Sequence, residues 1–296
     1  MPLPIDSQVL DALAGRARTH AERFFLPLRE HHWRGNAGDY VGGGIGSSLD
    51  FQDHRTYLPG DDPRHINWQA YARTGEYSLK LYREEVQPIV EILFDVSGSM
   101  FIEPDKATRA LELFYFARAA GEKSGAATGA ILVKGDHWKP LESDAVFSHR
   151  WQDFASALPD TAASAPPNLA AVPLRARSLR VFISDLLFPS DPESLLRALQ
   201  RGAGKAIVLA PFSPAESDPD WSGNYAFIDS ESGDRHDRRI HPALLRRYLD
   251  AYRDHFARWK AASLRVRTPL ARVPAATNFE KALQLEALSA GALQPG

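Results

Sequence analysis

The sequence predicts an α/β fold, a doubly wound and mostly parallel sheet, preceded by a smaller module of helix, loop and strand. Three observations indicate this fold. After Pro88, short apolar runs alternate with stretches of helical periodicity, which is typical of strands joined by crossover helices. The apolar runs are nearly continuous, as expected for strands buried on both faces. Two of them end in an aspartate, at Asp95 and Asp185.

Spacing and composition predict the elements in order. Apolar side chains three and four positions apart over 6–30 predict an amphipathic helix, and alternation over 76–83 predicts a half-buried strand. The change of pattern near residue 87 divides the chain into an N-terminal module, 1–87, and an α/β domain, 88–296. Within that domain we expect strands over 89–95, 130–133, 179–185 and 206–210, and helices over 105–123, 147–158, 191–201 and 243–262.

Composition excludes several classes of protein. With 44% hydrophobic and 24% charged residues, the chain has the profile of a folded globule, and a net charge of −2 argues against a polycation built for nucleic acid. The absence of cysteine excludes disulfides and thiolate metal sites. No apolar run reaches the roughly 18 residues of a membrane span, and the first residues lack the basic start of a secretory signal. We therefore expect a cytoplasmic location and no membrane partner.

One motif has the position of a ligand site. Asp95-Val96-Ser97-Gly98-Ser99 follows a buried strand directly and precedes a helix. Ligands of open parallel sheets bind beyond the carboxyl ends of the strands, and hydroxyl and carboxylate oxygens suit Mg²⁺ or Mn²⁺. Asp185 reaches the same crevice if the two strands are neighbours. The alternative is a capped helix start, in which the serines satisfy free backbone N–H groups.

Other motifs fail on position or spacing. Gly202-Ala203-Gly204-Lys205 has Leu199 where a phosphate-binding loop has its first glycine, and it lies between a helix and a strand rather than the reverse. The histidines show no metal-ligand spacing.

The motif resembles the metal-ion-dependent adhesion site of von Willebrand factor A domains. The segment from Tyr57 to Glu76 narrows the resemblance to the bacterial family called domain of unknown function 58, which joins such a segment to an A-type domain. The signature residues are Gly60, Asp61, Asp62, Arg64, Trp68 and Arg73.

For the site, the resemblance implies a divalent cation, Mg²⁺ or Mn²⁺. By position in the motif, its ligands are Asp95, Ser97, Ser99 and Asp185. The family's intervening threonine is missing, because Pro167 stands at its place. Either Asn168 or Thr161 substitutes, or the site binds metal weakly or not at all.

The signature segment itself has two interpretations. Asp61, Asp62 and Arg64 form either a turn held by a local ion pair or a charged contact with another surface. Trp68 is expected to pack in a core, and Arg73 is expected to pair with Glu76 across the next turn.

The near-neutral total conceals a basic stretch. Residues 235–272 contain eleven basic and three acidic side chains. On a long helix they form either a solvated face or a surface for an acidic partner; nucleic acid is not expected, because no aromatic platform accompanies the charge. The arginines expected on such a surface are Arg238, Arg239, Arg246, Arg247 and Arg253.

Our leading functional hypothesis is a non-enzymatic interaction module. The resemblance implies an adaptor that works with a MoxR-type AAA+ ATPase, or with its client protein, and binds a partner carboxylate through the cation. Two alternatives stay open: a metal-dependent hydrolase in the same crevice, and a metal-independent domain that binds through the basic surface.

Overall fold

The computed structural model describes residues 4–28, 49–84, 87–160, 165–228 and 233–296. The chain forms two compact units, one of residues 1–30 together with 88–296 and one of residues 31–87. One division falls after residue 87, and residues 1–30 belong to the larger unit together with 88–296.

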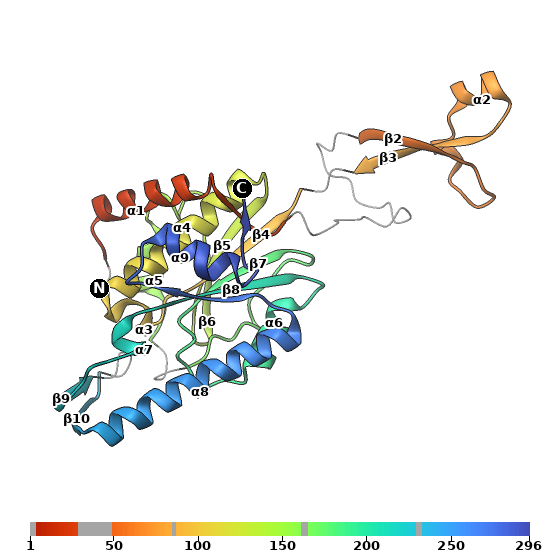
Figure 1. Cartoon of the computed structure of the whole chain (residues 1–296). Coiled ribbons are helices and arrows are strands. Elements are labelled where there is room, and N and C mark those ends of the chain that lie inside the picture. The colour runs from red at the N-terminus through yellow and green to blue at the C-terminus, as the bar shows by residue number, and fades with distance from the viewer. Residues whose placement is uncertain (1–3, 29–48, 85–86, 161–164, 229–232) are drawn as a thin grey trace. The chain divides into compact units, whose positions relative to one another are not determined.

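The larger unit is built on a six-stranded sheet with the order β11-β8-β7-β4-β5-β6 (Figure 1). Neighbouring strands are parallel except β6, which runs antiparallel to β5. The predicted α/β fold with a mostly parallel sheet is therefore confirmed. The strands are β4 (Ile89–Asp95), β5 (Ala127–Lys134), β6 (His137–Pro140), β7 (Leu179–Ile183), β8 (Lys205–Phe212) and β11 (Leu270–Pro274).

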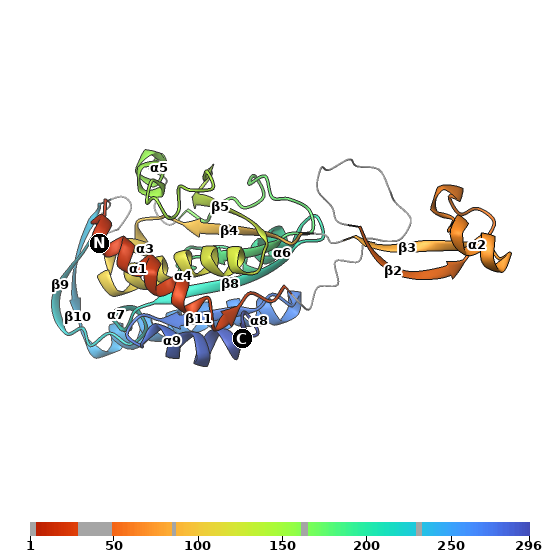
Figure 2. The same cartoon turned by 90° about the horizontal axis from the view of Figure 1, so that it is seen from above.

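Helices cover both faces of this sheet. Figure 1 shows α1 (Ser7–His20) and α4 (Pro104–Lys123) on one face, with α6 (Pro192–Gln200) and α8 (Pro242–Val266) on the other. Seen from above, α1 lies along α4 (Figure 2). The remaining helices are α3 (Ser99–Ile102), α5 (Trp151–Ala157), α7 (Pro214–Ser217), α9 (Phe279–Ala282) and a π-helical turn over Leu283–Leu288.

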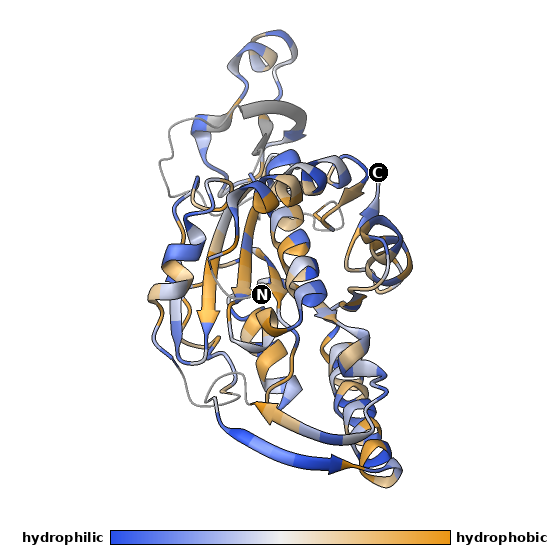
Figure 3. Cartoon of the chain, turned by 90° about the vertical axis from the view of Figure 1, so that its left-hand side faces the viewer, coloured by the Kyte–Doolittle hydropathy of each residue, from blue (hydrophilic) through white to orange (hydrophobic). Residues whose placement is uncertain are grey.

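The central strand supplies side chains to two cores. Val90, Ile92 and Phe94 pack in the core beneath α1 and α4, where the rings of Phe94 and Phe114 stack with centroids 4.3 Å apart. Leu93 points the other way, into the core closed by α6 and α8. This alternation explains why the strand is apolar almost throughout. In Figure 3 the central strands are correspondingly hydrophobic.

Helix α1 explains why the N-terminal residues join the larger unit. Its apolar stripe, which includes Leu10 and Leu13, is buried against the body of the unit. The expected helix over 6–30 is too long, because the chain turns after His20 and forms β1 (Phe24–Phe25). That strand pairs with β12 (Gln294–Pro295) and so ties both ends of the chain together.

A hairpin outside the central sheet was not expected. β9 (Gly223–Ile228) pairs antiparallel with β10 (Arg235–Ile240) just before α8 begins. Figure 3 shows β10 as hydrophilic along most of its length. Arg238 and Arg239 therefore lie on a strand and not on the long helix to which the charge pattern had assigned them.

The smaller unit is described by itself. β2 (Leu49–Thr56) pairs antiparallel with β3 (Ser78–Glu84), and the connection carries a 3₁₀ turn (Pro63–His65) and α2 (Trp68–Thr74). Helix α2 begins where the Asn67 side chain accepts a hydrogen bond from Ala70 N, and it ends at Gly75, whose φ of 72° favours glycine.

The part of the signature from Gly60 to Arg64 forms a turn held by local ion pairs. Arg55 binds Asp61 at 2.6 Å and Arg64 binds Asp62 at 2.7 Å, while Gly60 has a φ of 108°. These contacts are the ones that the turn interpretation describes, and a charged contact with another surface stays a prediction.

Two expectations for the smaller unit are wrong. Trp68 is 58% exposed rather than buried, because it lies on the outer side of α2 and meets Tyr71 and Tyr77 only edge-on. Arg73 donates to the Gln69 carbonyl one turn back in the helix, at 3.4 Å, and forms no ion pair with Glu76 within the described part of the chain.

Candidate functional site

The candidate site lies at the carboxyl edge of the sheet, where β4 and β7 end side by side. Because the two strands are parallel neighbours, Asp95 at the end of β4 and Asp185, two residues beyond β7, reach the same edge. The predicted proximity of the two strand ends is confirmed. Both residues are almost fully buried, 2% and 3% exposed.

Asp95 is held by hydrogen bonds from both strand ends. Ser184 Oγ donates to its Oδ2 at 2.7 Å, and the backbone N–H of Ser97 donates to its Oδ1 at 2.9 Å. Burial raises the pKa of Asp95 to about 6, and the nearby Asp185 charge adds to the rise, while these hydrogen bonds oppose it. The Asp95 carboxyl therefore titrates close to neutral pH.

The two serines of the motif lie beside this carboxylate. The hydroxyls of Ser97 and Ser99 are 3.3 Å apart, at the start of α3. Asp185 is fixed by its own backbone N–H, which points to Met100 Sδ at 3.1 Å, and by its Oδ1, which accepts from Leu187 N. The four predicted site residues thus lie together at this edge of the sheet, and we call this largely buried cluster the crevice.

A lysine completes the crevice. Lys106, in the first turn of α4, is 1% exposed; its Nζ lies 3.0 Å from Asp185 Oδ2 and also binds Glu216 of α7. Burial lowers the pKa of Lys106, but the Asp185 and Glu216 carboxylates outweigh it and hold the pKa above its usual value. The crevice therefore already contains a positive charge that is paired with two carboxylates.

These side chains do not fit a divalent cation as they lie. The Lys106 ammonium engages Asp185, and both oxygens of Asp95 accept hydrogen bonds. Because the Lys106 ammonium lies 3.0 Å from Asp185 Oδ2, it repels a divalent cation near Asp185 and competes with it for the carboxylate oxygens. Within the described residues, no group of three or more His, Asp or Glu is arranged to hold a metal ion.

Among the described residues, none near the position of the missing threonine is placed as a replacement ligand. Pro167 is buried and has no side-chain donor atom. The Asn168 side chain is exposed and donates through Nδ2 to Asp136 at 3.1 Å, just beyond β5, and it has no hydrogen bond to Asp95, Asp185 or the two serines of the motif. Thr161, the other candidate, lies outside the described residues.

The crevice is also poorly arranged for acid–base chemistry. A general base must reach a substrate with a free lone pair. Among the described crevice carboxylates, Asp185 and Glu216 are ion-paired with Lys106, and Asp95 is buried behind its hydrogen-bond donors. The ion pairs of Lys106 connect α4 with α7 and with the edge of the sheet, and they leave neither Asp185 nor Glu216 free to act as a base.

Sequence reasoning missed three residues of this site. Ser184 had a signal, since it precedes Asp185 at a strand end. Glu216 stands three residues after Ser213, the spacing of a helix cap, and its Oε2 accepts from Ser213 N at 3.2 Å. Lys106 had only a weak signal, because it is one of four cations in the predicted helix 105–123 and nothing in the pattern sets it apart from the others.

The basic surface is separate from this crevice in the sequence and in its elements. Arg253 forms a loose ion pair with Asp250 at 3.7 Å, within α8. The four other arginines of the predicted surface have no ion pair with any described carboxylate, and they are exposed; they are Arg238, Arg239, Arg246 and Arg247.

Comparison with known proteins relates the chain to proteins without an assigned activity. Residues 53–258 match the family described as "Protein of unknown function DUF58". Uncharacterized proteins of Mycobacterium tuberculosis (strain H37Rv) and Mycobacterium bovis are each 26% identical over 239 residues, which is 76% of this chain and 72% of theirs.

Two solved structures share a weaker likeness. The conserved hypothetical protein BatB from Bacteroides thetaiotaomicron is 13% identical, with a TM-score of 0.37 over 69% of this chain and 98% of that one. An aerotolerance-related membrane protein from Bacteroides fragilis is 14% identical, with a TM-score of 0.32 over 61% and 98%. In the present chain, none of the described helices combines the length and apolar character that crossing a membrane requires.

Proposed function

We propose that this chain, which belongs to the DUF58 family, is a non-catalytic, cytoplasmic interaction module. In this proposal, the chain binds its partner without a metal ion. The observation that carries this proposal is the buried Lys106 ammonium between Asp185 and Glu216. A cation that bridges to a partner's carboxylate needs an open coordination position. Here the chain's own ammonium takes the place of the cation; Asp185 beside it is almost fully buried, and Glu216 is partly buried.

A surface for the partner is available elsewhere. Four exposed arginines of β10 and α8 have no ion pair with a described carboxylate; they are Arg238, Arg239, Arg246 and Arg247. Arginine forks suit the carboxylates of an acidic protein surface. As partner we propose the MoxR-type AAA+ ATPase that the family resemblance implies, or a client of that ATPase, with this chain as an adaptor of von Willebrand factor A type.

The test compares two variants in capture of the purified MoxR-type ATPase of the source organism. Mg²⁺ and ATP are kept constant, because the ATPase itself requires them. Asp95→Asn removes the first expected ligand charge. Its amide oxygen can still accept from Ser97 N, and its NH2 group stands in place of the oxygen that accepts from Ser184 Oγ. We expect this variant to capture the ATPase as well as wild type does, and the double variant Arg238→Glu/Arg246→Glu to lose capture.

Other outcomes would identify the alternatives. Loss of capture by Asp95→Asn alone would favour a metal-bridged contact. Metal-dependent turnover of phosphoester substrates by wild type, abolished in Asp95→Asn, would favour a hydrolase. Failure of wild type to capture the ATPase would overturn the proposed partner.

A further inference from the structure

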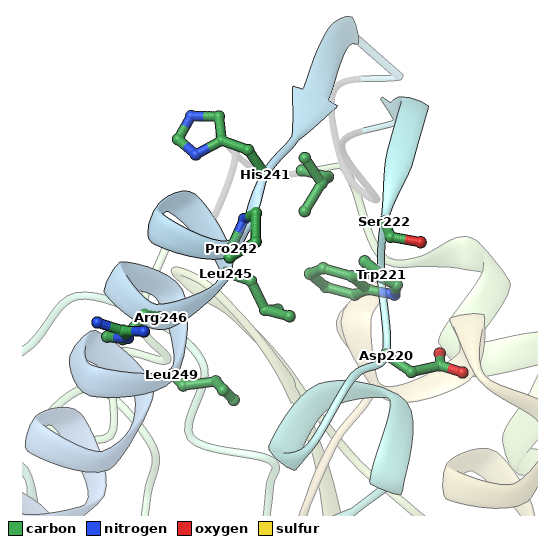
Figure 4. A pocket seen from close by; sticks show the side chains of 9 residues that line it. Asp220, Trp221, Ser222, His241, Pro242, Leu245, Arg246 and Leu249 are labelled. Atoms are coloured by element: carbon green, nitrogen blue, oxygen red, sulfur yellow. The ribbon is translucent and has the colours of Figure 1, made fainter.

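An apolar slot lies where the β9–β10 hairpin meets the beginning of α8. It has a volume of about 390 Å³, which is within the size range of ligand sites. Figure 4 shows the side chains of Trp221 and Leu245 pointing toward each other across it, while those of Asp220 and Ser222 point away. The apolar lining consists of Trp221, Ile240, Pro242, Leu245 and Leu249.

Aromatic packing gives the slot a built wall. The Trp221 ring lies 5.3 Å from Phe227 of β9 and 5.2 Å from Tyr248 of α8, measured between centroids. Tyr248 in turn donates through its hydroxyl to the Glu216 carbonyl at 2.8 Å. The slot is therefore held from the strand, from the helix and from α7, so that an entering side chain meets a preformed surface.

Arginines flank this slot. Side chains alternate along a strand, so Arg238 shares a face of β10 with Ile240, which lines the slot. Arg246, one residue after Leu245, belongs to the slot's own lining. Both are exposed, and neither has an ion-pair partner among the described carboxylates, whereas Arg235 nearby is paired with Asp237 at 2.9 Å.

We propose that this slot binds an acidic linear segment of a partner protein, which inserts one large apolar side chain between Trp221 and Leu245. Carboxylates that flank the anchor pair with Arg238 and Arg246. The proposal rests on the function proposed above and names the docking site and the partner's chemistry. Nucleic acid fits less well, because the Trp221 ring already packs against Phe227 and Tyr248 and the rest of the apolar lining is aliphatic, which leaves less aromatic surface on which a base could stack.

The test uses a fluorescein-labelled peptide of about twelve residues, rich in glutamate with one central phenylalanine, and measures anisotropy with the full chain. We expect saturable binding that quenches or shifts Trp221 fluorescence. Replacing the phenylalanine by alanine should weaken binding about tenfold or more, as expected for loss of one buried anchor. Replacing the glutamates by lysines should abolish it.

Variants of the chain test which of its residues contact the peptide. Leu245→Asp should weaken binding about tenfold or more, and Arg238→Glu, on an exposed strand position, should do the same without disturbing the slot. Arg258→Glu is the matched control, because Arg258 is an exposed arginine farther along α8. It should leave the affinity within about twofold of wild type.

Several results would overturn the proposal. These are equal affinity for the phenylalanine and alanine peptides, no binding by wild type, and tighter binding of a single-stranded oligonucleotide than of the acidic peptide. Self-association of the chain that Leu245→Asp abolishes would show that a second copy occupies the slot instead. If the peptide does not bind but wild type still captures the ATPase, the assignment of the slot is wrong and the proposed function stands. If the peptide binds in the slot but wild type does not capture the ATPase, the slot assignment stands and the proposed partner is wrong.

Discussion

The Nζ of Lys106 lies 3.0 Å from Oδ2 of Asp185, and both side chains are nearly out of contact with water, 1% and 2% exposed. The two residues come from different elements, Lys106 from the first turn of α4 and Asp185 from the segment two residues beyond β7. A divalent cation would be exchangeable, whereas this ammonium is part of the chain. The Lys106 ammonium therefore supplies the crevice with a positive charge that is in place once the domain has folded.

Replacing Lys106 by methionine should destabilise the protein strongly. Methionine keeps much of the apolar stem but leaves the Asp185 and Glu216 carboxylates buried without a cation. Loss of one member of a buried ion pair costs about 3–5 kcal/mol. Urea unfolding at pH 7.5 measures the change in the free energy of unfolding.

Lys123→Met is the matched control for this prediction. Lys123 is in the same helix and binds Glu22, but the two side chains are 46% and 60% exposed. An exposed pair contributes no more than about 1 kcal/mol. Similar stabilities for the two variants would show that the Lys106 pairs are not structurally important.

Asp95→Asn should make the protein more stable at pH 7.5 than wild type. The pKa of Asp95 is raised to about 6 in the folded chain, above its ordinary value of 3.8, mainly by burial. The folded state therefore binds the proton more tightly, so the Asp95 contribution falls as pH rises from about 4 to 6 and stays low above that window. Two pKa units correspond to about 3 kcal/mol.

The measurement is the difference in unfolding free energy between Asp95→Asn and wild type, taken in urea with EDTA at several pH values. This difference should grow in favour of the variant between about pH 4 and pH 7, by up to roughly 3 kcal/mol. A difference that does not change with pH, or a variant that is less stable at pH 7.5, would contradict the raised pKa.

Gly204→Ala should clash with a buried guanidinium. A Cβ at Gly204 would lie 2.5 Å from Cζ of Arg180, which is fully buried and donates to the carbonyls of Arg201 and Arg175 at 2.7 Å. Because these bonds fix the guanidinium, the overpacked chain should lose about 1–3 kcal/mol of stability. Close packing against Arg180 thus explains why glycine stands at position 204. This explanation agrees with the conclusion that the segment is not a phosphate-binding loop.

Gly129→Ala provides the comparison for Gly204→Ala. Gly129 is also in the larger unit, on β5, and a Cβ there meets no atom within 4 Å. Alanine at such a position should be neutral or stabilising by up to about 1 kcal/mol, through the unfolded state. Equal losses at the two glycines in thermal or urea unfolding would rule out the Arg180 contact as the cause.

The sheet was predictable and the charge balance of its crevice was not. Buried parallel strands are continuous apolar runs, so β4 and β7 and their terminal aspartates could be read directly. Whether Lys106 points into the crevice depends on the rotation of α4 about its axis, which packing against the sheet determines. A residue pattern within one helix does not contain that information.

The hairpin was missed for a different reason. β10 reads Arg-His-Asp-Arg-Arg-Ile, which lacks the apolar alternation of a half-buried strand. It is a strand because it pairs residue by residue with β9, for example Arg238 with Tyr225. Trp68 shows the opposite error, since a large apolar residue predicts burial but 58% of it is exposed.

Leu10→Ala should destabilise the whole larger unit, because α1 is part of its core although it precedes the smaller unit in sequence. Leu10 is fully buried against the core that contains Trp151, and its truncation should cost about 2–5 kcal/mol. Val9→Ala is the control, since Val9 is the neighbouring residue but 44% exposed, and it should change stability by no more than about 0.5 kcal/mol.

Urea unfolding followed by tryptophan fluorescence reports the transition through the buried Trp151 and Trp259, which lie in the cores on opposite faces of the sheet. If Leu10→Ala leaves that transition at the wild-type midpoint, α1 is not an integral part of the larger unit. A shift of the single transition, with no change for Val9→Ala, is the result we expect, because the α1 stripe and the sheet share one continuous core.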